Sequence, residues 1–285
     1  MPEPFRIQQP PFVPEDAPRW KAAVDALGWY FKMELAPGIV TGGHVDVSSP
    51  EKARAHADAY GFPPSLRGKT VLDIGSADGF FAFEAERRGA ARVVSLDVGR
   101  PLLMDFGPQG FRREFARAAV LGHQSAMRYD VPAAMLDEWV EHWERSIDSH
   151  LSFYFARAIL GSNVERLTLE LSQLSPERIG AKFDVVFCFG VLYHLRDPLG
   201  ALERVAAITR EYALINSALA DQHFPDEKIP EDRPYARYVP AGECFGDHTY
   251  WWLPNLACLE AWVASSGFKR VERVPVNKNL VRAFV

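Results

Sequence analysis

The chain has 285 residues, of which 48% are hydrophobic and 24% charged, which predicts one sizeable core in a single domain with additions. Its formal net charge of −5 disfavours a nucleic-acid partner, because binding to phosphate backbones needs concentrated positive charge. No apolar run approaches the length of a membrane span, and the proline-rich N-terminus lacks the basic-then-apolar pattern of a signal peptide. Cys188, Cys244 and Cys258 are isolated in sequence, which predicts reduced thiols in a cytoplasmic protein.

Residues 1–66 are expected to form an N-terminal arm and cap helices. Prolines recur through residues 1–18 and predict an extended arm. Residues 19–35 have a helical pattern that ends before a Pro-Gly pair, and residues 50–60 predict a short helix.

Residues 67–285 have the pattern of an α/β domain. Short apolar strands alternate with helical segments, an order that gives a mostly parallel sheet. A helix is predicted at 79–88, and the last two strands indicate a reversed edge strand. The predicted strands are 69–74, 91–96, 164–170, 183–189, 212–217, 269–276 and 280–285.

Two segments are longer than the connections that such a sheet requires. Residues 100–162 form a long insertion with amphipathic stretches at 110–121, 132–146 and 148–160. The second is a loop at 220–254, rich in proline and aromatic residues. Substrates of α/β sheets bind beyond the carboxyl ends of the strands, so both segments are predicted to cap a site there. The insertion could also serve as an oligomer interface, and we expect a homo-oligomer.

The most informative motif is residues 71–81, where an apolar strand ends in an acid and a glycine-bearing turn leads into an apolar helix. Gly75 and Gly79 would let the backbone approach a ligand closely. About twenty residues further on, the next strand ends in Asp97, a carboxylate that can accept both hydroxyls of a ribose. The motif therefore predicts a cofactor that contains a nucleoside.

The acids of this turn narrow the choice of cofactor. A dinucleotide site needs one more glycine, so that pyrophosphate can sit on the helix N-terminus, and Asp73 and Asp78 would repel that phosphate. S-adenosylmethionine (SAM) instead carries a sulfonium and an ammonium, which acids would attract. An ordinary glycine turn is the alternative, but Asp97 and the later strands favour the cofactor.

These motifs resemble those of the class I SAM-dependent methyltransferases, from about Arg67 to the C-terminus. The first-motif turn, the ribose acid and residues 183–195, which match the fourth strand and the loop after it, carry the resemblance. It implies a Rossmann-like fold, with a seven-stranded, mostly parallel sheet and a helical cap insertion, and it implies SAM as the cofactor. The cofactor-binding residues that it indicates are Asp73, Gly75, Ser76, Gly79, Phe80, Asp97, Val98, Ser172, Gln173 and Phe189.

A narrower resemblance covers most of the chain except the insertion. Residues 29–41, 192–198 and 250–254 resemble segments of a subfamily related to the tRNA wobble-uridine carboxymethyltransferases. Phe31 stands where that subfamily usually has His, and the Lys-Gly-Pro-type segment that precedes its first motif is missing. A SAM that carries an extra carboxylate would lack the lysine-containing segment that binds it, so unmodified SAM is the expected cofactor.

Glu170 is a further departure, because relatives commonly have a small residue at this place. It is predicted to close the third strand, on the face where methyl donor and substrate should meet. A carboxylate in an apolar site can accept a proton, so Glu170 is the predicted catalytic base. The alternatives are a solvent-facing glutamate at a strand end, or one that helps to hold adenine.

Aromatic residues are abundant in the predicted cofactor and cap segments, and they suit a cationic ligand or intermediate. An aromatic face stabilises a cation by about 1 kcal/mol, and by more when water is excluded. An alkene held in line with the sulfonium methyl would attack it and become a carbocation, from which Glu170 would remove a proton. A bacterial branch that resembles this subfamily methylates prenyl diphosphates, notably geranyl diphosphate at C6, and we predict that activity here.

The predicted diphosphate requires cationic partners. The insertion contains arginines but no lysine, and the planar guanidinium suits phosphate oxygens. Magnesium would bridge the diphosphate, although no metal-ligand motif is recognisable. The predicted substrate-binding residues are Tyr30, Phe31, Arg112, Arg128, Tyr193, His194 and Trp251.

Three other functions stay open from the sequence. A tRNA-modifying methyltransferase has the whole-chain resemblance in its favour, and the acidic balance and the departures against it. A phenol or amine methyltransferase would need a base, a role that His194 could serve. A non-catalytic SAM-binding or scaffold protein is disfavoured by the intact first motif and Asp97.

Overall fold

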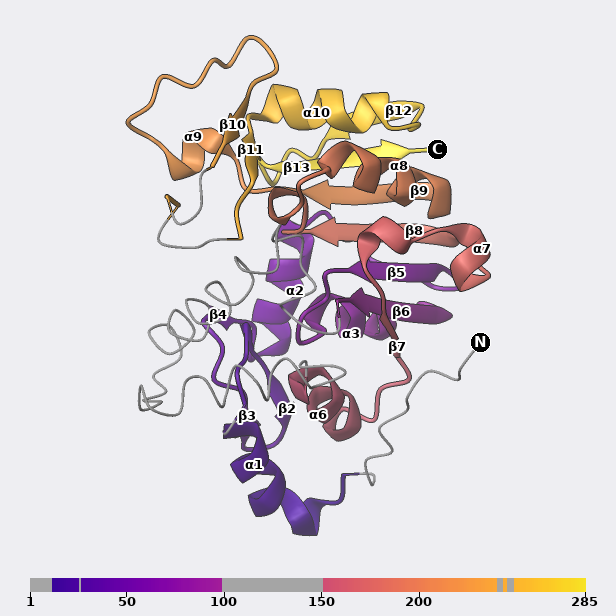
Figure 1. Ribbon diagram of the computed structural model, residues 1–285. Coiled ribbons are helices and arrows are strands. Elements are labelled where there is room, and N and C mark those ends of the chain that lie inside the picture. Colours follow the sequence, from indigo (N-terminus) through magenta and orange to yellow (C-terminus); the bar gives the residue numbers. More distant parts are fainter. Residues whose placement is uncertain (1–11, 26, 99–150, 240–242, 245–248) are drawn as a thin grey trace, which may run out of the picture.

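The computed structural model describes residues 12–25, 27–98, 151–239, 243–244 and 249–285 (Figure 1). These residues build a seven-stranded sheet in the order β12-β13-β9-β8-β5-β6-β7, in which the strands from β9 to β7 pair in parallel. β13 is antiparallel to both of its neighbours. The strands are β5 (Thr70–Ile74), β6 (Arg92–Asp97), β7 (Glu165–Thr168), β8 (Phe183–Phe189), β9 (Thr209–Asn216), β12 (Arg270–Arg273) and β13 (Leu280–Phe284).

This sheet confirms the Rossmann-like, mostly parallel fold that the sequence predicts. Two details differ. The reversed strand is β13, which lies second from the edge, so it is not the edge strand itself. β9 begins at Thr209, earlier than the predicted 212, because α8 (Pro198–Ile208) passes into the strand without a loop.

Helices cover both faces of the sheet, because successive residues of a strand point to opposite sides. Val71 of β5 joins one hydrophobic core with α2 (Pro50–Ala59), α3 (Phe80–Arg87) and α6 (Leu151–Ile159). Leu72 and Ile74 join the other core with α8 and α10 (Leu256–Ser265). Each fully buried Leu or Val contributes about 1.5–3 kcal/mol to the stability of this three-layer arrangement.

Local capping residues explain where several helices begin. Ser49 caps α2, Asp197 caps α8 and Asn255 caps α10, each accepting a hydrogen bond from a backbone amide in the first turn. The shorter helical elements are η1 (Pro14–Asp16), η4 (Leu171–Gln173), α7 (Pro176–Ile179), η5 (Leu192–His194) and α9 (Ala220–His223).

The N-terminal segment corrects the helix predicted over residues 19–35. α1 covers only Ala17–Asp25, and short strands follow: β1 (Phe31–Lys32), β2 (Glu34–Ala36), β3 (Ile39–Val40) and β4 (Val45–Asp46). The Thr41 hydroxyl donates to the Phe31 carbonyl at 2.5 Å and accepts from the Met33 amide at 2.7 Å. These two hydrogen bonds stabilise an extended backbone at residues 31–33.

The start of the predicted extended arm, residues 1–11, lies outside the described residues. Its end is not extended, because residues 14–16 form η1 and α1 begins at Ala17. The helix predicted at 50–60 is confirmed by α2.

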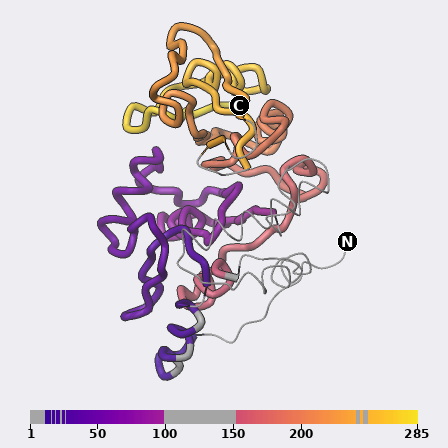
Figure 2. The backbone as a smooth tube through the Cα atoms, turned by 60° about the vertical axis from the view of Figure 1, so that its left-hand side comes forward, coloured from indigo at the N-terminus to yellow at the C-terminus, as the bar shows by residue number. Residues whose placement is uncertain are grey.

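Of the predicted insertion, the stretches at 110–121 and 132–146 lie outside the described residues, whereas α6 occupies most of the stretch at 148–160. The loop at 220–254 contains α9, β10 (Ala236–Tyr238) and β11 (Trp252–Pro254), of which the two strands pair in antiparallel fashion. Figure 2 shows the N-terminal elements and the C-terminal elements at opposite ends of the molecule. Within the described residues, no helix combines the length and apolar character needed to span a membrane.

Candidate active site

A cavity of about 760 Å³ lies at the carboxyl ends of the parallel strands. Its lining comes from the first-motif turn after β5, the end of β6, the segment after β7 and the end of β8. Residues of the N-terminal segment and of the loop at 220–254 also line it, so both segments contribute walls at this edge of the sheet (Figure 1).

The first-motif turn is fixed by backbone geometry and by Asp97. Gly75 and Gly79 have φ angles of +73° and +92°, in the left-handed region that favours glycine. The neighbours that leave no space for a side chain are Val191 at Gly75 and Phe153 of α6 at Gly79. Asp97 accepts from the amides of Ala77 and Val98, both at 2.7 Å, and so ties the turn to β6.

Asp73 is the buried acid of the site. Its side chain is 1% exposed, and one carboxylate oxygen, Oδ2, has no hydrogen-bond partner in the described part of the chain. Burial, and secondly the nearby Asp97, raises the pKa of Asp73 from 3.8 to about 8. The ammonium of SAM would donate a hydrogen bond to this oxygen, so the buried carboxylate of Asp73 fits that part of the cofactor.

Arg166 of β7 holds the first-motif turn through hydrogen bonds of its guanidinium. Its Nη1 donates to the hydroxyls of Ser76 at 2.7 Å and Ser95 at 2.9 Å, and its guanidinium lies 4.9 Å from the ring centroid of Phe153. Its charge opposes the rise in the pKa of Asp73. Sequence reasoning missed Arg166, because an arginine in a strand next to a long insertion has no recognisable spacing to the motif.

Aromatic rings form one wall of the cavity. Tyr60, Phe81 and Phe189, which come from three different elements, lie with ring centroids 4.8–4.9 Å apart in every pairing. We call these three residues the aromatic triad. Phe31 extends it, with its centroid 5.6 Å from that of Phe81. Sequence reasoning missed Tyr60, which lies just after α2 and outside any motif.

Histidines and tyrosines line another part of the cavity. His194 Nδ1 lies 3.1 Å from the Thr249 carbonyl, and His223 Nδ1 lies 3.0 Å from the Leu219 carbonyl. A carbonyl can only accept a hydrogen bond, so the ring Nδ1–H is the donor in each of these two contacts. Tyr250 packs against both, with centroids 5.6 and 5.7 Å away.

The structure brings most of the predicted site residues to this cavity. Those that line it are Tyr30, Phe31, Asp73, Gly75, Ser76, Asp97, Val98, Glu170, Ser172, Phe189, Tyr193 and His194. Glu170 is half-buried and lies two residues past the end of β7, so it does not close the strand as predicted. The Ser172 hydroxyl lies 3.4 Å from one of its carboxylate oxygens.

Four predicted residues, Gly79, Phe80, Gln173 and Trp251, do not line the cavity. Gly79 faces α6, and Phe80 is fully buried with its centroid 4.6 Å from that of Phe31. The ring of Trp251 packs under the Arg196 guanidinium at 5.1 Å. Arg112 and Arg128 lie outside the described residues. Nowhere in the described part do three side chains gather that could ligate a metal, so magnesium ligands stay unidentified.

The sheet order, the first-motif turn and the acids of the cavity define a SAM-dependent methyltransferase with a Rossmann-like fold. The profile of the family described as "Methyltransferase domain" matches residues 51–273, and the chain belongs to this family. Residues 51–273 therefore form a methyltransferase domain, and the acids that line its cavity fit SAM as the methyl donor.

Curated relatives include tRNA U34 carboxymethyltransferases. The one from Syntrophotalea carbinolica is 32% identical over 211 residues, which are 73% of this chain and 47% of the relative. The one from Azotobacter vinelandii is 26% identical over 213 residues, 74% of this chain and 49% of the relative. The chain thus spans about half the length of the curated relatives that it matches. Among solved structures, the N-terminal domain of EvdMO1 with SAH bound is 16% identical, covers 96% of this chain and 95% of its own, and has a TM-score of 0.48.

Proposed function

We propose that this enzyme transfers the methyl group of SAM to a carbon of a prenyl diphosphate, and specifically to C6 of geranyl diphosphate. The observation that carries the proposal is the aromatic triad, which lines the same cavity as Glu170. An apolar wall of this kind suits a prenyl chain, and its ring faces suit a cation. We also propose that residues 67–285 form the catalytic domain and residues 1–66 its arm and cap.

The residues around the cofactor have distinct proposed roles. Asp73 would hold the ammonium, Asp97 the ribose hydroxyls, and the segment around Ser172 the adenine edge. When bound, SAM supplies an electrophilic methyl group on its sulfonium. Tyr30 and Phe31 would then close the acceptor side of the cavity.

The proposed reaction keeps atoms and charge balanced. The π electrons of the acceptor alkene form the new carbon–carbon bond while the carbon–sulfur bond breaks, and the positive charge passes to the tertiary alkene carbon. Glu170 takes a proton from the neighbouring carbon, and the electrons of that C–H bond restore the alkene. The aromatic triad would stabilise the cation between these two steps, and arginines of the insertion, with magnesium, would hold the diphosphate.

Modification of a tRNA wobble uridine is the second candidate. The printed names of the curated relatives favour it more directly than they favour a prenyl substrate. The matched segment covers only 49% and 47% of those two relatives, and the net charge of −5 gives no support for binding to RNA.

One labelling experiment separates the two candidates. The protein is given SAM with a labelled methyl group and, side by side, geranyl diphosphate with magnesium or bulk tRNA that lacks wobble modification. Label in an organic-extractable product after phosphatase treatment would support the prenyl substrate. Label in RNA would overturn it in favour of the second candidate. Label in neither would reject both and direct the search to phenols and amines, with His194 as the base.

A further inference from the structure

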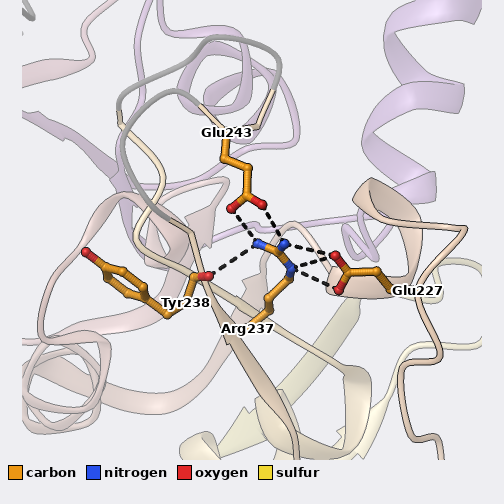
Figure 3. Close-up of polar contacts among 4 residues, drawn as sticks. All are labelled: Glu227, Arg237, Tyr238 and Glu243. Atoms are coloured by element: carbon orange, nitrogen blue, oxygen red, sulfur yellow. Dashed lines mark hydrogen bonds and ion pairs between the residues drawn. The ribbon is translucent and has the colours of Figure 1, made fainter.

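Arg237 of β10 lies at the centre of a polar cluster in the loop at 220–254 (Figure 3). Its guanidinium is bound on two adjacent edges, by Glu243 above it and by Glu227 to its right in Figure 3. Nη2 and Nη1 donate to Glu243 at 2.7 and 2.8 Å, and Nη2 and Nε donate to Glu227 at 2.9 and 3.0 Å. Nη1 also donates to the Tyr238 carbonyl at 3.3 Å. We call Arg237, Glu227 and Glu243 the clasp.

The clasp depends on properties that only arginine has. Every N–H group of the guanidinium donates a hydrogen bond, and its planar fork serves two carboxylates at once. The Arg237 side chain is 14% exposed, whereas the two glutamates are 42% and 40% exposed. The guanidinium also lies 3.7 Å from the ring centroid of Phe224. A partly buried arginine with two bidentate partners is a far stronger constraint than a pair of exposed side chains.

The clasp is connected to the cavity by short structural links. Phe224 follows His223, which lines the cavity. β10 pairs with β11, and the neighbouring Trp251 amide donates to the Tyr193 carbonyl at 2.8 Å. A small hydrophobic core includes residues that touch the clasp, such as Phe224, and residues that line the cavity, such as Tyr193 and Tyr250. It is formed by Ala220, Val239, Cys244 and Leu253, with Tyr193, Phe224 and Tyr250 packed against it.

We propose that Arg237 is a positioning residue for the methyl acceptor, because its clasp joins Glu227, β10 and Glu243 and thereby keeps His223 and Tyr250 at the cavity. The proposal rests on methyl transfer from SAM and applies to whichever acceptor the labelling experiment identifies. Loss of the clasp lowers the fraction of molecules with the wall in place. It thereby weakens acceptor binding and leaves unchanged the SAM site, which is built from β5, β6 and the first-motif turn and not from this loop.

Cys244 reports on the loop without any substrate. It follows Glu243 directly and is 2% exposed, while the other cysteines, Cys188 and Cys258, lie in β8 and α10. The reaction of native protein with an aromatic disulfide reagent should be slow in the wild type. In R237Q one thiol should react about tenfold faster or more, because buried thiols become reactive when they are exposed. R237K should lie between, and C244S in the R237Q background should remove the fast phase.

R273Q is the matched control. Arg273 makes a bidentate pair with Glu260 at 2.6 and 2.8 Å, but its side chain is 63% exposed and it does not line the cavity. R273Q should leave thiol reactivity unchanged. An unchanged thiol rate in R237Q would overturn the proposal, even if the labelling experiment found neither candidate acceptor.

The kinetic test separates positioning from general instability. With the acceptor found by labelling, R237Q should raise the acceptor KM about tenfold while the Kd for SAM stays within about twofold of wild type. A parallel loss of SAM affinity, or an unchanged acceptor KM, would overturn the positioning role. Partial recovery of KM in R237K would support it.

Discussion

Asp78 lies in the first-motif turn, and its Oδ2 accepts a hydrogen bond from the backbone amide of Phe31 at 2.9 Å. The same oxygen accepts from the Tyr30 amide at 2.8 Å. Asp78 is 2% exposed, so these bonds are largely shielded from water. The turn that would hold the cofactor is thereby attached directly to Tyr30 and Phe31, which line the cavity and are proposed to face the methyl acceptor.

Asp78→Ala should loosen the attachment of Tyr30 and Phe31 to the first-motif turn. The change leaves two amide groups in a poorly solvated site without their acceptor, at a cost of about 1–3 kcal/mol each. We expect kcat/KM to fall about tenfold or more, and the melting temperature to drop. Asp78→Asn is the control, because an amide oxygen can still accept both bonds, and it should lose less. Equal effects of the two substitutions would show that the hydrogen bonds to Tyr30 and Phe31 do not cause the loss of kcat/KM and of thermal stability.

Asp73 should make SAM binding depend on pH. Its pKa is raised to about 8 by burial and by Asp97, so near pH 7 the carboxyl of the free protein is mostly protonated. An incoming ammonium favours the ionised form, so binding below about pH 8 should release a proton. Calorimetry in two buffers of different ionisation enthalpy measures how many protons are released on SAM binding, and Asp73→Asn should abolish this release. Proton release that persists in the Asn variant would contradict the assignment.

The same shift has a consequence for stability. Between about pH 4 and pH 8 the folded protein retains on Asp73 a proton that the unfolded chain has lost. This group therefore lowers the free energy of unfolding as pH rises through that window. The melting temperature of Asp73→Asn without SAM should fall less over this range than that of the wild type, and a steeper fall would contradict the prediction.

The sequence predicts the sheet well, because alternation and strand length are local properties that survive in the folded chain. The helix predicted over residues 19–35 was wrong at its end, because the helical spacing of residues 31–35 was overridden by hydrogen bonds to Thr41 and Asp78. Asp78 itself was predicted to favour a cationic ligand, whereas in the structure it binds backbone amides. Gly79 was predicted to let the backbone approach the ligand, whereas in the structure it does not line the cavity, and a side chain there would meet Phe153 and Phe83.

The candidate site was predictable where a motif marks it and not elsewhere. Asp73 and Asp97 belong to a strand–turn–helix pattern with fixed spacing, so their meeting at one edge follows from the fold. Tyr60 and His223 reach the cavity, and Arg166 reaches Ser76 of the first-motif turn, only through tertiary packing, and no spacing in the sequence relates them to the motif. Such residues become candidates only once the walls of the cavity are known.

Glu170→Gln tests the proposed base. The substitution keeps the size of the side chain and removes its ability to take a proton, so SAM affinity should stay near wild type while turnover falls about 10²-fold or more. Glu177→Gln is the control, because Glu177 is an exposed glutamate of α7 that does not line the cavity. Full activity of Glu170→Gln would remove Glu170 from the mechanism and leave it a structural or adenine-side residue.

The aromatic triad gives the sharpest test of a cationic intermediate. Tyr60→Phe keeps the ring, whereas Tyr60→Leu keeps an apolar side chain without a ring face. If the triad stabilises positive charge, Tyr60→Phe should retain most of the activity. Tyr60→Leu should then lose about fivefold to thirtyfold in kcat, the equivalent of about 1–2 kcal/mol for one cation–ring contact in a dry site. Steady-state rates at saturating SAM measure this. Similar losses in both variants would point to the Tyr60 hydroxyl instead. Similar retention in both would mean that the wall acts by shape alone, and the carbocation would then need stabilisation from other groups of the cavity.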